Sequence, residues 1–546
     1  MKLDLDGWLA QRWMRIVLWS IIGALSVAKF LYLSADFPNW SIWMIDQAKF
    51  TDEGWWAGAA VMHALTGHWY VAGDYNPAVA LPVWPILLGV LFHFTGVSVV
   101  AARALNVLLS TATLGVVFVL VRRSAGGKSD TPALWATLLL ASSPFAFVFN
   151  RLAILETLVV FEFCLLMLAA SCASAKRIGP LAALAALATT MLLTKTTAAL
   201  LIPAVGWMAW SSIGRNAPGL LKSIAALILV PAAFVKGYAA FASALGYGAD
   251  YNYFFGVNAM PDIDWRQTLS TLHDLFLNCF WIDRVLYPVG LVILVVTAAW
   301  KRKLWSNPLF TASWIAIGAQ VAFIFHRQDD YAPRYFLAML PPLVWIVALT
   351  FSELLAHARK NDSQNPASEI PSPPKPLHAP SLRVFRERMG NHEPHPAHLE
   401  SGFWTSSKTA LLLLVAMAGA VVANAVMIGQ FFTHREYGFH DAAISIQAII
   451  RSHPEQKPLM LGVSGPQISL MTGIPSINDF YGTEDAAEKL ARYQPGWYLA
   501  WNGIAPENEA LLAPYRLEKM ASYPAFDDDE RTTLILYRMV RREDHD

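Results

Sequence analysis

Two neighbouring carboxylates, Asp52 and Glu53, follow the first long apolar segment of the chain. Tryptophans come directly after them at Trp55 and Trp56, and a second polar and aromatic stretch covers residues 67–77. Rings of Trp and Tyr collect where a membrane meets water, and a positioned carboxylate can take a proton from a reacting group. Acidic groups in such surroundings predict chemistry on an amphipathic substrate that lies at the membrane face.

The composition predicts that most of the chain lies in a membrane. Of its 546 residues, 15% are charged and 55% are hydrophobic, whereas soluble proteins carry about 25% charged residues. The mean hydropathy is +0.40, and apolar runs long enough to cross roughly 30 Å of hydrocarbon recur along the chain. The formal net charge of +1 gives no sign of a nucleic-acid partner. The three cysteines match neither a disulfide framework nor a zinc-binding spacing.

Basic residues set the predicted orientation, because Lys and Arg stay on the cytoplasmic side of short loops. Lys2, Arg12 and Arg15 place the N-terminus inside, so Asp52 falls outside. The first span is too long for a signal-peptide core and lacks a clear cleavage site, so we expect it to be retained. About eleven transmembrane helices fit the basic loops, over residues 16–33, 97–121, 131–149, 157–175, 179–194, 196–213, 219–240, 285–300, 306–325, 335–353 and 407–430. The short segment 82–94 is left to lie along the surface or to re-enter.

Because successive spans alternate between the two sides of the membrane, this arrangement brings scattered polar groups to one side. The outer side receives Asp52 together with residues 150–156, Lys195, residues 251–266 and residues 326–334. An ionisable group near bilayer depth costs about 2.5–3.5 kcal/mol at a helix centre, so such groups tend to mark function. Opposite charges that converge in this way predict a site.

Two polar regions lie beyond the main set of spans. Residues 354–406 form a Pro- and His-rich cytoplasmic linker, for which a His-based metal site is the alternative reading. The last span covers residues 407–432, and residues 433–546 then lie outside. Helical periodicity in this last region alternates with strand-like stretches near 458–463, 496–501 and 532–539. It predicts a small extracytoplasmic α/β domain that caps the site.

The segment from Thr51 to Trp69 resembles the first outer loop of the GT-C glycosyltransferases, in particular the protein O-mannosyltransferases and the aminoarabinose or uronic-acid transferases that modify lipid A. The shared pattern is an Asp-Glu pair, a helix and a Gly-x-Trp turn, here Gly67-His68-Trp69. Further motifs follow in the family's order through most of residues 15–350: Phe94-Thr95-Gly96-Val97 with Arg103, Ile154-Leu155-Glu156, Leu193-Thr194-Lys195, Ile202-Pro203, Tyr253-Phe254-Phe255, Pro333-Arg334-Tyr335 and Pro341-Pro342.

The resemblance implies a polytopic α-helical protein with a GT-C membrane module over residues 1–353. It also implies a sugar donor linked to a polyprenyl phosphate. The sugar would pass to a lipid, glycan or protein hydroxyl at the periplasmic face of the inner (plasma) membrane, where membrane lipids surround the protein. The chain departs from the family where Asn76-Pro77 replaces a lysine followed by two prolines, where Glu156 replaces an Asp, and where Thr196 replaces a glycine. These departures leave the details of donor binding open.

The expected chemistry follows from the donor. A glycosyl phosphate is already activated, so the enzyme needs a base for the acceptor hydroxyl, which contributes about 10²–10⁴-fold, and positive charge for the leaving phosphate. We expect Asp52 to be the base, with attack opposite the phosphate and inversion of the anomeric centre. Glu156 would orient the acceptor or the sugar, or hold a cation. The other predicted substrate-binding residues are the cations Lys195, Arg334 and Arg151, together with Glu53, Tyr335 and His326.

Each assignment has a structural alternative. Asp52 and Glu53 also describe acids in the first turn of a helix, where they interact favourably with its dipole. Glu156 could form a structural bridge to Arg151. Lys195 could be an interfacial lysine that extends its side chain toward water. Arg334 could simply anchor the span that follows it.

The sequence predicts no required cofactor, and it leaves a divalent cation open. His326, Asp329 and Asp330 have ligand chemistry for such an ion, although a solvated loop explains the same residues. The rival function is a polytopic transporter or flippase of lipid-linked sugar. That class is expected to show internal repeats with interrupted helices, and the sequence shows none. A non-enzymatic assembly subunit could have lost the acids that this chain keeps.

Overall fold

The computed structural model describes residues 9, 11–37, 46, 50–127, 129–174, 176–258, 266, 303–326, 333–363, 406–525 and 532–542. The predicted span 285–300 and most of the predicted linker lie outside these residues, as do Asp329 and Asp330.

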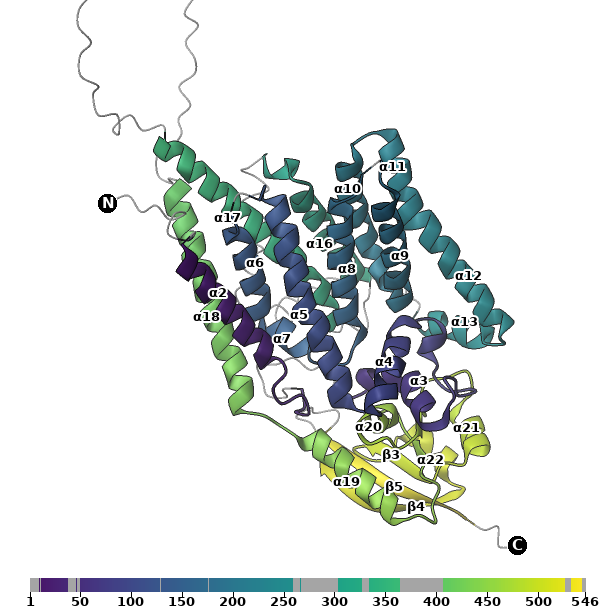
Figure 1. Ribbon diagram of the computed structural model, residues 1–546. Coiled ribbons are helices and arrows are strands. Elements are labelled where there is room, and N and C mark those ends of the chain that lie inside the picture. The colour runs from purple at the N-terminus through teal and green to yellow at the C-terminus, as the bar shows by residue number, and fades with distance from the viewer. Residues whose placement is uncertain are drawn as a thin grey trace, which may run out of the picture.

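Apolar helices of different lengths stand side by side in one bundle (Figure 1). They are α2 (Arg12–Ala28), α5 (Val99–Ser124), α6 (Thr131–Ser142), α8 (Leu155–Ser171), α9 (Ile178–Thr194), α10 (Ile202–Ile213), α11 (Ala217–Ile224), α12 (Val230–Ala244), α16 (Pro308–His326), α17 (Leu340–Ser363) and α18 (Ser406–Thr433). Shorter helical pieces join them: α7 (Pro144–Phe149), η3 (Thr196–Leu201), η4 (Ala225–Leu229), η6 (Leu304–Ser306) and η7 (Pro333–Met339).

Within the described residues, five helical segments are long and apolar enough to cross a membrane. They are 99–124, 196–213, 217–244, 333–357 and 408–452, and four further apolar helices are shorter. The predicted multi-pass helical architecture is confirmed. The count of about eleven spans stays a prediction.

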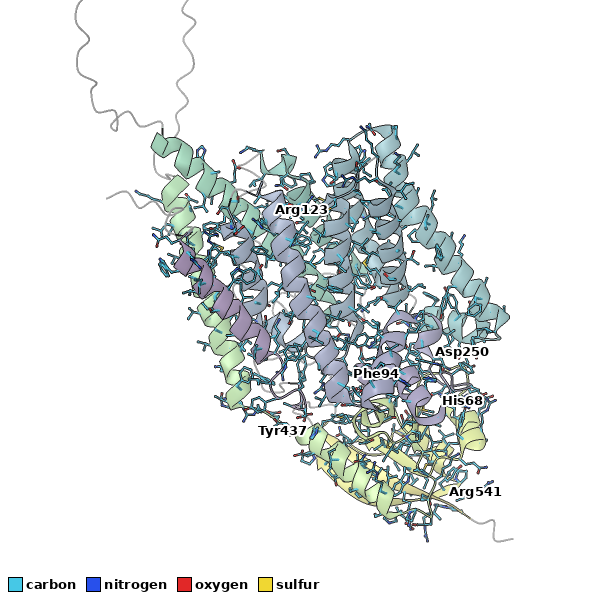
Figure 2. All side chains as sticks on the ribbon, viewed as in Figure 1. His68, Phe94, Arg123, Asp250, Tyr437 and Arg541 are labelled. Carbon is cyan, nitrogen blue, oxygen red and sulfur yellow. The ribbon has the colours of Figure 1, made fainter. Side chains whose placement is uncertain are left out.

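The two ends of the bundle differ in charge and structure. Arg122 and Arg123 end α5, and Arg123 lies at the upper end in Figure 2. Arg122 forms an ion pair with Asp130 there, with Nε 2.8 Å from the carboxylate oxygen Oδ1. The opposite end carries α3 (Asp52–Thr66), α4 (Val83–Thr95), α13 (Gly248–Val257) and the turn η2 (Pro77–Val79) (Figure 1). The basic turn at Arg122-Arg123 and the first carboxylates therefore occupy opposite ends.

Helix α4 is the segment expected to lie along the surface or to re-enter. At 1.5 Å per residue its 13 residues span only about 20 Å, too little to cross the hydrocarbon. One face of the helix is buried through Trp84, Leu88 and Phe92, which recur at a spacing of four residues. The other face exposes Val90 and Phe94. The buried face packs in one apolar cluster with α3, so α4 supports the helix that begins at Asp52.

The C-terminal region folds into a five-stranded sheet with helices. Its helices are α19 (Gly438–Ser452), α20 (Gly465–Thr472), α21 (Ala486–Tyr493) and α22 (Pro506–Leu512), and its strands are β1 (Met460–Leu461), β2 (Ser476–Ile477), β3 (Trp497–Trp501), β4 (Tyr515–Pro524) and β5 (Thr533–Arg541). The strand order is β2-β1-β3-β5-β4. Strand β1 runs parallel to both neighbours, and β5 runs antiparallel to both of its own. The predicted small α/β domain is confirmed. It lies against the end of the bundle that carries α3 (Figure 1).

Candidate active site

Asp52 is the first residue of α3 and is buried, with 2% of its surface exposed. One carboxylate oxygen, Oδ1, accepts a hydrogen bond of 3.1 Å from the Thr51 hydroxyl. The other, Oδ2, lies 2.7 Å from Nη2 of Arg334. Asp52 is therefore both an acid in a first helical turn and one half of a buried ion pair, and its role as a base stays a prediction.

Arg334 joins three carboxylates that are far apart in the sequence. It lies in η7, directly before α17, and is 7% exposed. Besides Asp52, its guanidinium forms an ion pair with Asp46, and its backbone N–H also donates to Asp46 Oδ2 over 3.3 Å. Its Nε lies 3.6 Å from Oε1 of Glu156. A single planar cation thus holds the acids together, as the fork of donors on arginine allows.

Lys195 completes the cluster from the end of α9. Its ammonium forms an ion pair with Glu156 and lies 4.3 Å from the centre of the Tyr335 ring. The same ring lies 5.1 Å from the guanidinium carbon of Arg334. Tyr335 therefore contacts both cations through its π face. The structure brings together five of the predicted site residues: Asp52, Glu156, Lys195, Arg334 and Tyr335.

Two carboxylates of the cluster, Asp52 and Glu156, have properties that suit a reaction with a hydroxyl group. Burial raises the pKa of Asp52 above its ordinary value, although the guanidinium of Arg334 acts in the opposite direction. A carboxylate with a raised pKa is a stronger base. The second oxygen of Glu156, Oε2, is buried and finds no hydrogen-bond donor among the described residues. A buried oxygen in that state can accept a bond from a substrate hydroxyl group.

One hollow borders the cluster, and a second lies beside α4. The first, of about 30 Å³, lies beside Glu156 and Lys195, and Tyr335 and Gln320 also line it. The second, of about 560 Å³, lies between α12 and α4 with the turn before it, and its lining includes the aromatic side chains Trp69, Tyr70, Tyr238, Phe241 and Tyr247. Pockets for small molecules are mostly apolar with a few placed polar groups. The second hollow has the size and the lining of such a pocket.

Glu53 lies next to Asp52 in the chain but outside the cluster. Its Oε1 accepts from Arg103 Nε over 2.8 Å and from the backbone N–H of Ala153 over 2.7 Å. Its Oε2 accepts from Arg103 Nη2 over 2.6 Å and from Gln467 Nε2 over 2.9 Å. The carboxylate is fully buried and satisfied by protein donors. These contacts give Glu53 a structural role in place of the predicted contact with substrate.

Arg151 is also held away from the cluster. Its Nη2 donates to the backbone carbonyl oxygens of Leu31 and Tyr32, over 2.7 and 2.8 Å. Its guanidinium carbon lies over the rings of Phe147 and Phe431, at 4.8 and 4.3 Å. The alternative bridge from Arg151 to Glu156 does not form, because Glu156 pairs with other cations. His326 ends α16, and its side chain lies outside the described residues.

Asp46 is a member of the cluster that the sequence did not suggest. It is buried and forms the ion pair with Arg334 described above. The available signal was an acid six residues before Asp52 in the same outer loop, in a run of aromatic residues that includes Trp40 and Trp43. A single acid in a loop carries no spacing pattern, so the signal was weak.

Comparisons with known proteins bear on the fold. A family model for dolichyl-phosphate-mannose-protein mannosyltransferase matches residues 77–235. The structure of ArnT from Cupriavidus metallidurans in the apo state aligns over 95% of this chain and 96% of its own, with 15% sequence identity and a TM-score of 0.56. The same protein bound to undecaprenyl phosphate aligns over 96% and 98%, with 14% identity and a TM-score of 0.59. An oligosaccharyltransferase from Archaeoglobus fulgidus aligns over 95% and 76%, with 12% identity and a TM-score of 0.51. No curated protein sequence matches significantly.

The chain has the GT-C fold. The resemblance found in the sequence is thereby confirmed as a likeness of fold that extends over nearly the whole chain. Within the part of the chain that the structure describes, no group of three or more His, Cys, Asp or Glu side chains is arranged to hold a metal ion.

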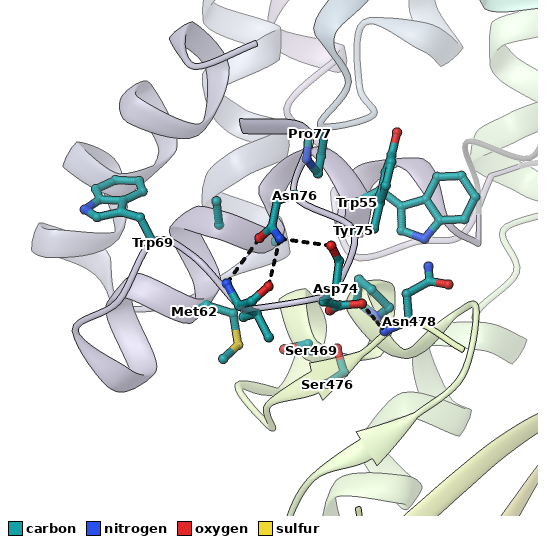
Figure 3. Close-up of a pocket in the computed structure, with 14 residues that line it drawn as sticks. Trp55, Met62, Trp69, Asp74, Tyr75, Asn76, Pro77, Ser469, Ser476 and Asn478 are labelled. Atoms are coloured by element: carbon teal, nitrogen blue, oxygen red, sulfur yellow. Dashed lines mark hydrogen bonds between the residues drawn. The ribbon is translucent and has the colours of Figure 1, made fainter. Parts of the chain in front are cut away.

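The structure shows the contacts of Asn76, which stands where the sequence departs from the family pattern (Figure 3). Asn76 donates to Asp250 Oδ1 over 3.1 Å and to the backbone oxygen of Asp74 over 2.9 Å. A cation does lie beside this loop: Lys489 of α21 donates to Asp74 Oδ1 over 3.1 Å. It also donates to the backbone oxygens of Asn478 and Tyr481, over 2.7 and 2.5 Å. All three ammonium protons are therefore used within the protein, so this lysine fastens the C-terminal domain to the loop.

Proposed function

We propose that this protein is an inverting membrane glycosyltransferase that moves a sugar from a polyprenyl-phosphate carrier to an acceptor hydroxyl group. The observation that carries the proposal is the buried cluster of Asp52, Glu156, Lys195 and Arg334 at the end of a GT-C bundle. An acid for the hydroxyl proton and two cations for the leaving phosphate are the groups that this reaction needs.

The reaction runs as a single displacement at the anomeric carbon. The acceptor oxygen forms a bond to that carbon while the bond to the carrier phosphate breaks, and the hydroxyl proton passes to Asp52. Lys195 and Arg334 take up the negative charge that develops on the departing phosphate. Glu156 orients the sugar or the acceptor through its oxygen Oε2, which is not hydrogen-bonded in the described protein.

The ion pair between Asp52 and Arg334 gives the donor a second role. A carboxylate that pairs with a guanidinium is a weaker base than one that does not. When the carrier phosphate binds to Arg334, it competes with Asp52 for the same donors. Donor binding therefore strengthens the base at the moment when an acceptor proton must be removed.

A hollow beside α4 and the likeness of fold to ArnT support a lipid-linked carrier. The aromatic hollow beside α4 suits the lipid part of a carrier, and ArnT, which shares this fold, has been solved with undecaprenyl phosphate bound. The acceptor is a lipid, a glycan or a protein hydroxyl. The site faces the periplasm from the inner membrane, with the C-terminal domain on the same side and residues 354–406 in the cytoplasm.

A panel of polyprenyl-phosphate sugars tests the proposed function. The purified protein should transfer sugar from at least one donor to a lipid, glycan or protein acceptor, and mass spectrometry should detect both the product and the free carrier phosphate. A nucleotide sugar in place of the lipid-linked donor should give no product. The same assay with and without EDTA decides whether a divalent cation takes part. Movement of intact donor between leaflets without any product would favour the rival flippase.

Sidedness is tested with single cysteines in a background cleared of Cys164, Cys172 and Cys279. Ser522 is exposed on β4, and Ser306 is exposed at the opposite end of the bundle. In spheroplasts, a membrane-impermeant thiol reagent should label Ser522→Cys and should spare Ser306→Cys until the cells are lysed. Protection of the first and labelling of the second would place the active site in the cytoplasm.

A further inference from the structure

A buried amide side chain of the C-terminal domain contacts α3, the helix that begins at Asp52. Gln467 of α20 is fully buried. Its Oε1 accepts from the backbone N–H of Gly54 over 2.7 Å, and its Nε2 donates to Glu53 Oε2 over 2.9 Å. Both partners belong to the first turn of α3, directly after Asp52. Helix α20 lies beside α3 in the assembled molecule (Figure 1).

The first turn of α3 needs this outside partner. The first N–H groups of a helix have no partner within it, and a side chain at the N-cap position commonly supplies one. Thr51 stands at that position, yet its hydroxyl makes no cap hydrogen bond and donates to Asp52 instead. Gln467 therefore provides from another domain the acceptor that the local sequence does not provide.

The same amide also helps to hold the side chain of Glu53. Glu53 is held from three directions, by Arg103, by the N–H of Ala153 and by Gln467. Ala153 lies three residues before Glu156, so this carboxylate ties the start of α3 to the segment that carries the second acid of the site. Gln467 closes that network from the side of the C-terminal domain.

The packing at Gly54 shows how closely the two helices meet. A side-chain carbon at Gly54 would lie 2.2 Å from the backbone nitrogen of Gln467 and 2.3 Å from the backbone carbon of Pro466. Such contacts are far below van der Waals distance, so only glycine permits this approach. Trp55 adds a hydrogen bond of 3.0 Å from its indole N–H to the backbone oxygen of Val463. The start of α3 therefore packs against α20 and the segment before it through the consecutive residues Glu53, Gly54 and Trp55.

We infer that Gln467 is a positioning residue for the glycosyl transfer, which sets the place of Asp52 by holding the first turn of α3. The inference rests on the proposed function for its kinetic consequence. The base must lie within hydrogen-bond reach of the acceptor hydroxyl, and a displacement of about 1 Å can cost on the order of 100-fold in rate. The C-terminal domain thus contributes to catalysis through this amide.

Two variants test the inference. Gln467→Met keeps the length of the side chain and loses both hydrogen bonds, and Gln467→Glu still accepts from Gly54 but repels Glu53. Each should lower kcat by about 10- to 100-fold while KM for the lipid-linked donor stays within about twofold, because the phosphate-binding cations are untouched. The matched control is Gln456→Met. Gln456 is a partly buried amide that donates to the backbone oxygens of Gly496 and Met539, over 3.2 and 2.8 Å, in a part of the C-terminal domain away from α20, and its replacement should leave kcat unchanged.

Hydrogen exchange provides a readout that needs no activity. In Gln467→Met the amide of Gly54 should exchange at least about tenfold faster, since it loses its acceptor, while helices in the bundle keep their exchange rates. Unchanged exchange at Gly54 would overturn the inference, and so would kcat values per folded enzyme within twofold of wild type in both variants. If the wild-type protein transferred no sugar, the proposed function would fail, and the exchange measurement would still decide whether Gln467 holds the first turn.

Discussion

Asp52→Asn should abolish most of the turnover and leave the protein folded. Asn has nearly the same shape as Asp and can still accept the bond from Arg334, but it cannot take a proton from the acceptor. A positioned general base contributes about 10²–10⁴-fold, so kcat should fall by at least two orders of magnitude. Binding of the polyprenyl-phosphate donor should persist. Single-turnover rates together with thermal unfolding and donor binding measure the three quantities separately.

The pH dependence of the wild-type rate carries the same assignment. Burial raises the pKa of Asp52 above its ordinary value of 3.8. The base works when deprotonated, so the rate should fall as the pH drops through this raised pKa, and the acidic limb of kcat should lie above pH 3.8.

Glu353→Gln is the matched control for Asp52→Asn. This acid pairs with Lys303, with Nζ 2.7 Å from Oε1, and lies on α17 away from the site. Its replacement should leave kcat unchanged. A rate for Asp52→Asn close to wild type would remove Asp52 from the role of base and leave Glu156 as the acid to test.

The sequence predicted the cluster because successive spans must alternate between the two sides of the membrane along the whole chain. Once basic loops are placed inside, Asp52, Glu156, Lys195 and Arg334 must emerge on the other side, whatever their separation in the chain. The apolar helices of the bundle, the short helix α4 and the α/β domain followed from length and periodicity. These features depend on whether a segment contacts lipid, protein or water, and the pattern of apolar and polar residues in the segment reflects that contact.

Pairing between the residues of the predicted outer face could not be read in the same way. Arg151 is predicted on the same side as the cluster, but its guanidinium carbon lies over the rings of Phe147 and Phe431, because packing of α7 against α18 decides its neighbours. Asp46 pairs with Arg334 over a separation of 288 residues, and Gln467 meets Gly54 over 413. Such partners share no spacing and no periodicity, so one sequence alone gives no signal for them.

Arg334→Ala should have the second large effect, on both stability and donor binding. The guanidinium is buried and pairs with Asp46 and Asp52, and its Nε lies 3.6 Å from Glu156. Removal of one partner from a buried ionic network leaves the others uncompensated and costs about 3–5 kcal/mol. The predicted loss of a charged hydrogen bond to the carrier phosphate adds about 1.5–3 kcal/mol in binding. Chemical denaturation and titration with a polyprenyl phosphate measure the two losses.

A matched pair of variants separates charge from geometry. Arg334→Lys keeps the charge but presents a single ammonium, which cannot reach Asp46 and Asp52 as the planar fork does. It should recover part of the stability and little of the rate. Arg122→Ala is the control, since Arg122 pairs with Asp130 at the opposite end and its side chain is 52% exposed. An exposed pair contributes about 0–1 kcal/mol, so this variant should stay close to wild type.

If Arg334→Ala bound the carrier as tightly as wild type, the phosphate would lie elsewhere, and Arg334 would serve only to hold the acids together. In that case Asp52 would remain paired when the donor is bound, and the proposed strengthening of the base by the donor would fall with it.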